Sequence, residues 1–162
     1  MAYEVEAWSD FFVATAGATA ALTGLLFVAV SINLERILSI PGLPDRALSA
    51  LLLLLGALLV AVFGLAPGQG DGVVGAEVAV ITALGIAIQV RLIGRIQAAR
   101  REEAHLGGIV AFVFLGTVPF LVGGLSLAEG SSGGLYWVLA GTVGAIAGSV
   151  ANAWVLLVEV LR

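Results

Sequence analysis

Five long apolar stretches, separated by short segments rich in glycine, proline and charged residues, make up almost the whole chain. Each stretch has 21 to 23 residues. At 1.5 Å per residue, a helix of that length crosses roughly 30 Å of hydrocarbon. The pattern predicts an all-α integral membrane protein, a bundle of five transmembrane helices forming one domain over residues 1–162. The predicted spans are residues 11–32, 43–65, 73–93, 106–128 and 135–157.

Prolines separate or interrupt several of these spans, because proline lacks a backbone N–H and its ring blocks a helical hydrogen bond. The first span can continue as helix as far as Leu38, where Pro41 and Pro44 end it. Pro67 ends the second span. Pro119 lies inside the fourth span, where we expect it to kink the helix.

Composition supports the membrane assignment. Apolar residues make up 60% of the chain before the 22 glycines are counted, only 11% of residues are charged, and the mean hydropathy is +1.14. Soluble domains are about half apolar and about a quarter charged. The chain has no cysteine, which excludes disulfides, thiolate catalysis and cysteine-ligated metal sites.

The first ten residues, MAYEVEAWSD, contain three carboxylates and no basic residue. A secretory signal peptide begins with a positively charged region, so we expect the first span to be retained in the protein. Trp8, Phe11 and Phe12 fit either an aromatic anchor at the membrane interface or ordinary packing residues.

All seven basic residues are arginines, and they lie on alternate sides of the predicted spans. Arg and Lys accumulate in cytoplasmic loops close to the spans. The loops after the second and fourth spans contain no basic residue. The distribution predicts a multi-pass protein, in the plasma membrane, with its N-terminus outside and its C-terminus inside. The arginines are Arg36 and Arg46 around the first loop, Arg91, Arg95, Arg100 and Arg101 around the third, and Arg162 at the end.

The first two spans differ in side-chain size. Residues 14–21 are alanine, glycine and threonine only, whereas residues 51–55 of the second span are five consecutive leucines. Leucine suits a lipid-facing surface, and small residues allow helix backbones to approach closely. We therefore expect the first, third and fifth spans in the interior of the bundle and the second span facing lipid. The helical pattern of the third span also continues through RIQAARREE, which predicts a helix that projects beyond the bilayer.

Three of the spans carry small residues at three- and four-residue spacing, which places them on one helix face. Packing within one chain explains any single face of this kind. Three such faces in a short chain favour self-association, and we expect a homo-oligomer. The predicted helix-packing residues are Gly17 and Gly24 in the first span, Gly85 in the third, and Gly141, Gly144 and Gly148 in the fifth.

Polar residues inside the spans are the candidates for function, since an ionisable group in hydrocarbon must be compensated. Glu77 lies about one turn inside the third span. It is either an interfacial carboxylate or part of the mouth of a cation pathway. Thr15, Thr19 and Thr23 recur every four residues in the first span. Their hydroxyls either bond to the carbonyl one turn earlier or line the pathway.

A second polar group is expected at the cytoplasmic ends of three spans. A structural clasp between helices is the favoured interpretation, with a binding site as the alternative. Its residues are Asn33, Glu35, Arg36, Gln89 and Asn152.

Two apparent motifs are rejected. Residues 70–75, GDGVVG, match the glycine pattern of a dinucleotide-binding loop, but that loop needs a preceding strand and a βαβ unit. His105 adjoins Glu102 and Glu103, which is more typical of a solvated loop than of a metal site. We expect no metal, no cofactor, no catalytic residues and no nucleic-acid partner.

The leading functional interpretation is a small homo-oligomeric channel or permeation protein for small cations. Five narrow spans enclose an aqueous path poorly, so oligomerisation would be required. The alternative is a non-catalytic accessory or regulatory subunit that contacts another membrane protein through its small-residue faces.

Overall fold

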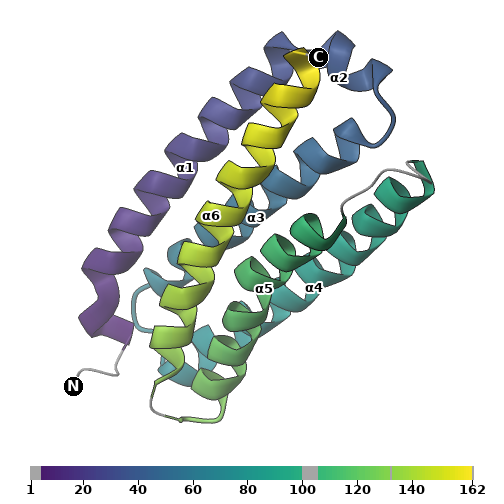
Figure 1. The fold of residues 1–162 in the computed structure, drawn as a ribbon. Helices are drawn as coiled ribbons and strands as arrows, with labels where there is room; N and C mark the ends of the chain where they lie inside the picture. Colours follow the sequence, from purple (N-terminus) through teal and green to yellow (C-terminus); the bar gives the residue numbers. More distant parts are fainter. Residues whose placement is uncertain (1–4, 100–105, 132, 162) are drawn as a thin grey trace.

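The computed structural model describes residues 5–99, 106–131 and 133–161 (Figure 1). Within these ranges all regular secondary structure is helical. One 3₁₀ helix and six α-helices follow one another. They are η1 (Val5–Trp8), α1 (Ser9–Ile32), α2 (Leu34–Ser39), α3 (Leu43–Gly64), α4 (Asp71–Ala99), α5 (Leu106–Ala128) and α6 (Gly134–Leu161).

In the part of the chain that the structure describes, four segments are long and apolar enough to cross a membrane. They are the segment formed by η1 and α1, and the helices α3, α4 and α6. This confirms an all-helical protein with several candidate membrane spans. The helix α5 has 23 residues, of which residues 113–128 are identified as a shorter apolar helix.

The first predicted helix does not run unbroken to Leu38. It stops at Ile32, and Asn33 leaves helical geometry with φ −105° and ψ 17° before α2 begins. The Asn33 side-chain amide donates to the carbonyl oxygen of Ala29 at 2.9 Å. Asparagine competes with helical bonding in this way, which explains the break.

The turn into α3 depends on glycine. Gly42 precedes this helix with φ 79°, in the left-handed region where a side chain would be strained. Pro44 follows in the first turn of α3, where its missing N–H costs nothing. The second span was predicted to begin at residue 43, and α3 begins there. The helix before it ends at Ser39, one residue beyond the predicted limit of Leu38.

The helix α3 is the centre of the bundle, and the expectation that it faces lipid is wrong. It packs against α1, α4 and α6. Figure 1 shows α3 between α1 and α4. In its most apolar part, 50% of the residues are buried. Leu53 and Leu54 of the leucine run are both buried.

The helix α1 lies at the edge, so the expectation that the first span is interior is also wrong. It packs along α3 and makes only slight contact with α6. Only 11% of the residues in its most apolar part are buried. The helix α5 packs between α4 and α6, and α3 packs against both α4 and α6. These four helices form a group, and α1 lies outside it against α3.

Phe12 joins α1 to the main apolar core. Its ring is almost fully buried and lies against Gly64, where an added Cβ would come within 2.8 Å of it. Trp8 and Phe11 pack at the edge of this core, and the Trp8 ring meets Tyr136 edge-on at 5.1 Å. These contacts support the packing interpretation of the N-terminal aromatic residues.

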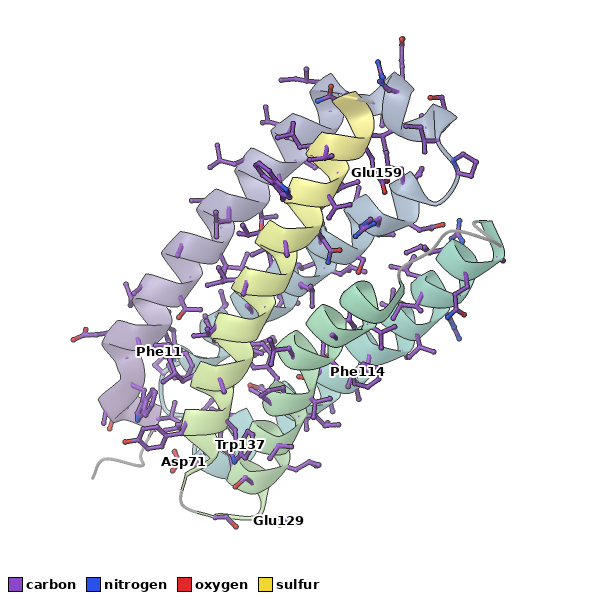
Figure 2. All side chains as sticks on the ribbon, viewed as in Figure 1. Phe11, Asp71, Phe114, Glu129, Trp137 and Glu159 are labelled. Carbon is purple, nitrogen blue, oxygen red and sulfur yellow. The ribbon has the colours of Figure 1, made fainter. Side chains whose placement is uncertain are left out.

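The two ends of the bundle differ in charge. Figure 2 shows Asp71 and Glu129 at one end and Glu159 at the other, where α2 also lies. Every described arginine belongs to the α2 end of its helix: Arg36, Arg46, Arg91 and Arg95. The opposite end therefore carries acidic residues and none of the described basic ones.

Candidate functional site

Polar side chains from three helices gather around the N-terminal half of α3. We call this group the α3 polar cluster. Asp45, Arg46 and Ser49 come from α3 itself, Gln89 and Arg95 from α4, and Ser149, Asn152 and Glu159 from α6. Residues four apart lie on one helix face, so Asp45 and Ser49 both face α4.

The Ser49–Gln89 pair is the innermost contact of the α3 polar cluster. The Ser49 hydroxyl donates to Gln89 Oε1 at 2.6 Å, and Gln89 Nε2 donates to the Ser49 carbonyl oxygen at 3.0 Å. Both side chains are buried. The reciprocal bonding compensates the cost of placing an amide in an apolar interior and fixes the register of α4 against α3.

A second contact joins α6 to α3. The Ser149 hydroxyl donates to the carbonyl oxygen of Ala50 at 3.0 Å. Asn152 lies one turn further along α6 and is 2% exposed, and its Nδ2 has no hydrogen-bond partner among the described residues. A buried donor without a partner typically costs about 1–3 kcal/mol. The α3–α6 contact is therefore less completely satisfied than the α3–α4 contact.

Two ion pairs lie at the α2 end of the α3 polar cluster. Arg46 lies 3.7 Å from Glu159 of α6, and Asp45 lies 3.3 Å from Arg95 of α4. The Arg95 side chain is largely exposed, so its pair contributes little to stability. Asp45 also lies in the first turn of α3, where the helix dipole favours a negative charge.

The predicted cytoplasmic clasp forms only in part. Gln89 and Asn152 are buried as expected, but Glu35 and Arg36 are exposed on α2, and the Asn33 amide bonds within its own helix. The α3 residues of the polar cluster were not among the residues predicted from the sequence. Their four-residue spacing at the start of the second span was the available signal, and the adjacent leucine run concealed it.

The threonine series of α1 faces α3. Thr15 and Thr19 are buried, and Thr23 is half-buried. The Thr19 hydroxyl donates to the Thr15 carbonyl oxygen at 2.6 Å, and the Thr23 hydroxyl to the Thr19 carbonyl oxygen at 2.7 Å. The back-bonding alternative therefore accounts for these two hydroxyls without a ligand.

Glu77 lies away from the threonine series, because α4 and α1 pack on different sides of α3. Its Oε1 accepts from Gln69 Nε2 at 3.1 Å. Its Oε2 is buried and has no hydrogen-bond partner among the described residues. The four pathway candidates are therefore not brought together within one chain.

The predicted glycine faces divide into two groups. Gly141 and Gly144 are buried against α5, where an added Cβ would collide with the Phe120 ring and with the Leu115 carbonyl oxygen, respectively. Gly148, one turn further along, is also buried. Gly17, Gly24 and Gly85 have nothing within 4 Å of an added Cβ. Packing within the chain therefore explains the α6 glycines but not the others.

Metal-ligating groups do not converge in the part of the chain that the structure describes. No set of three or more His, Cys, Asp or Glu residues there could hold a metal ion. His105, Glu102 and Glu103 lie outside the described residues. Residues 71–75 of the glycine-rich segment form the start of α4, and Gly75 packs against the backbone of α5. Comparison with protein families, curated proteins and solved structures finds no match for this chain.

Proposed function

We propose that the protein is a five-span integral membrane protein that acts as a non-catalytic, self-associating subunit, with α1 as its assembly helix. The spans in this proposal are α1, α3, α4, α5 and α6. The observation that carries it is the position of the small residues of α1. They lie on the face of the helix that points away from the rest of the chain.

The two faces of α1 follow from helix geometry. Each residue turns an α-helix by about 100°, so Gly17 and Thr19 are roughly 200° apart. Thr15 and Thr19 are buried towards α3, whereas Gly17, Ala21 and Gly24 are exposed. We call the row formed by Gly17, Ala21, Gly24 and Val28 the α1 glycine face. Its members are spaced by four, three and four residues.

A second copy of the chain is the partner that fits this face. Small residues allow the backbones of two membrane helices to approach closely, and lipid tails pack against such a face no better than a second helix does. A second copy inserted in the same orientation presents an identical face. The contact is then self-complementary, as in a twofold-symmetric dimer.

The five-span topology is supported by the arrangement of the helices and the charges. The start of α1 and the end of α6 lie at opposite ends of the bundle in Figure 1, as an odd number of crossings requires. The described arginines lie at the α2 end, which we assign to the cytoplasm because short cytoplasmic loops collect Arg and Lys. The C-terminus would then lie inside.

Cysteine labelling tests this topology on a background that has no native cysteine. An impermeant thiol reagent added to intact cells should label Gly70→Cys and Ser131→Cys but not Ala98→Cys. All three positions are exposed. Labelling of Ala98→Cys under the same conditions would contradict the five-span orientation.

Disulfide trapping in native membranes tests the assembly helix. Ala21→Cys on the α1 glycine face should give a covalent dimer on oxidation, because a disulfide forms when Cα atoms lie within about 7 Å. Thr19→Cys faces α3 and should remain monomeric, which makes it the matched control. A monomeric Ala21→Cys protein that purifies with a different membrane protein would favour the accessory-subunit alternative over self-association.

The second candidate function is a cation pathway formed between copies of the chain. It is favoured by the environment of Glu77. One carboxylate oxygen of this residue is buried without a hydrogen-bond partner in the described structure. Acidic side chains of this kind attract cations at channel mouths. Reconstituted protein should then conduct monovalent cations, and Glu77→Gln should reduce cation selectivity. Conductance no greater than that of empty liposomes would exclude this second function.

A further inference from the structure

A pocket of about 220 Å³ opens between α3, α4 and α5. Leu53 and Gly56 of α3, Thr82, Gly85 and Gln89 of α4, and Phe120 of α5 are among its lining residues. Gly56 and Gly85 have nothing within 4 Å of an added Cβ, so the two glycines leave the space between the helices unfilled. The exposed Leu55, Leu84 and Ile88 surround the opening, which places it on an apolar outer surface of the bundle.

Thr82 gives this pocket a polar group that the fold does not use. Its side chain is 6% exposed, and the structure assigns its hydroxyl no hydrogen bond among the described residues. Threonines 19, 23, 117 and 142 all donate to the carbonyl oxygen four residues earlier. Thr82 is in the middle of a helix as they are, but it has no such bond and is among the residues that line the pocket.

Gln89 supplies a second donor on the same side of α4. Residues three and seven positions apart share a helix face, so Thr82, Gly85 and Gln89 form one row about 10 Å long. Gln89 uses Oε1 and one N–H in its pair with Ser49. A side-chain amide carries two N–H groups, so one N–H remains available for a ligand. The pocket is thus apolar, with donors and no charged side chain among its lining residues.

We infer that this pocket binds a neutral, lipid-like molecule whose apolar body carries a hydroxyl or carbonyl oxygen. The oxygen accepts a hydrogen bond from the Thr82 hydroxyl, and the apolar body lies against Leu53 and Phe120. A dry apolar cavity of about 150 Å³ already admits a benzene-sized molecule, so the volume is sufficient for part of an alkyl or ring system. The absence of a charged lining residue disfavours a phosphate-bearing headgroup inside the pocket.

Three probes with equal numbers of non-hydrogen atoms test the inference: 1-decanol, 2-decanone and n-undecane. The measurement is the thermal unfolding midpoint of the purified full chain in detergent, since a ligand that binds the folded state raises it. One or both of the oxygen-bearing probes should raise the midpoint more than undecane does. A preference for one of them identifies whether hydroxyl or carbonyl is the better acceptor.

Variants connect that preference to the pocket. Thr82→Val keeps the side-chain shape and should lower the affinity for the oxygen-bearing probes roughly two- to tenfold, as expected for one hydrogen bond, without changing the response to undecane. Gly85→Leu should fill the pocket and abolish all three responses. Ala83→Leu is the matched control, because Ala83 is exposed on α4 and does not line the pocket.

Three results would overturn the proposal: equal responses of the parent protein to all three probes, an oxygen preference that survives in Thr82→Val, or unchanged binding in Gly85→Leu. Neither substitution should prevent folding. The Thr82 hydroxyl has no partner to lose, and a side chain at Gly85 points into open space. Self-association through α1 is a separate property, so failure of this test leaves the proposed assembly function unaffected.

Discussion

The helices α1 and α3 are both long and apolar, but they occupy opposite kinds of position. In their most apolar parts, 11% of the residues of α1 are buried and 50% of those of α3. The helix α1 carries small residues and hydroxyls, and α3 carries a run of leucines. Residue size alone predicted the reverse arrangement. A helix takes the central position in the bundle when different faces of it bind different neighbouring helices.

The helix α3 has three separate bonding faces. Ser49 binds Gln89 of α4, the Ala50 carbonyl oxygen binds Ser149 of α6, and apolar residues such as Leu26 of α1 pack against Leu54. The helix α1 has one buried face, on which the threonine hydroxyls bond back to their own helix. Hydroxyls that donate to carbonyl oxygens of their own helix do not form hydrogen bonds with another helix.

The largest expected effect separates internal glycine packing from the α1 glycine face. Gly144→Ile should prevent recovery of folded protein, at a cost of at least about 3 kcal/mol, because the side chain would meet the α5 backbone. Gly24→Ile should leave the fold intact and abolish dimer trapping. Size-exclusion profiles and unfolding midpoints of both variants measure the difference. Equal yields of the two folded proteins would contradict the distinction.

A smaller effect compares leucines on the two helices. Leu54→Ala removes a side chain that is 2% exposed and should lower the free energy of unfolding by roughly 2–5 kcal/mol. Leu25→Ala on α1 removes one that is 69% exposed and should change it by less than about 0.5 kcal/mol. Denaturant titration in mixed micelles provides both values. If the Leu25 change were the costlier one, α1 would not be peripheral.

Breaking the Ser49–Gln89 pair should lower the free energy of unfolding by less than Leu54→Ala does. Ser49→Ala leaves the Gln89 Oε1 without its donor, and hydrogen bonds between membrane helices average about 0.6 kcal/mol with a maximum near 1.7. A double-mutant cycle with Gln89→Ala measures the coupling. Ser39→Ala on α2 is the control, since the Ser39 hydroxyl bonds within its own helix and is exposed. A coupling energy near zero would remove this pair from the contacts that fix α4 on α3.

The smallest expected effect concerns the threonines of α1. Thr19→Val keeps the shape of the buried side chain and removes only a bond to its own helix, so the unfolding midpoint should move by about 1 °C or less. Ala21→Val, on the α1 glycine face, should leave the midpoint equally unchanged but weaken disulfide trapping from a neighbouring Gly17→Cys. A large loss of stability in Thr19→Val would assign the threonine series a role between helices.

The sequence predicted the helical class and most helix limits, because long apolar runs and the prolines between them leave few alternatives. It did not predict the break at Asn33, where a side chain competes for a backbone carbonyl. It also did not predict the α3 polar cluster. Ser49 and Gln89 are 40 residues apart, and only the packing of α4 on α3 brings them together.

The predicted packing glycines differ in what they contact within the chain. A small residue in a span indicates that something approaches closely, but the sequence does not say whether the approaching group belongs to the same chain. Gly144 meets α5, and Gly85 borders a pocket. The α1 glycine face is exposed because the opposite side of α1 packs against α3.

The order of two adjacent charges on α3 has a consequence for the handedness of the bundle. Asp45 pairs with α4 and Arg46 pairs with α6, and neighbouring residues on a helix face directions about 100° apart. If α4 and α6 exchanged places around α3, Asp45 would meet Glu159 and Arg46 would meet Arg95. Two attractions would become two repulsions. These two charges therefore favour the observed bundle over its mirror-related arrangement.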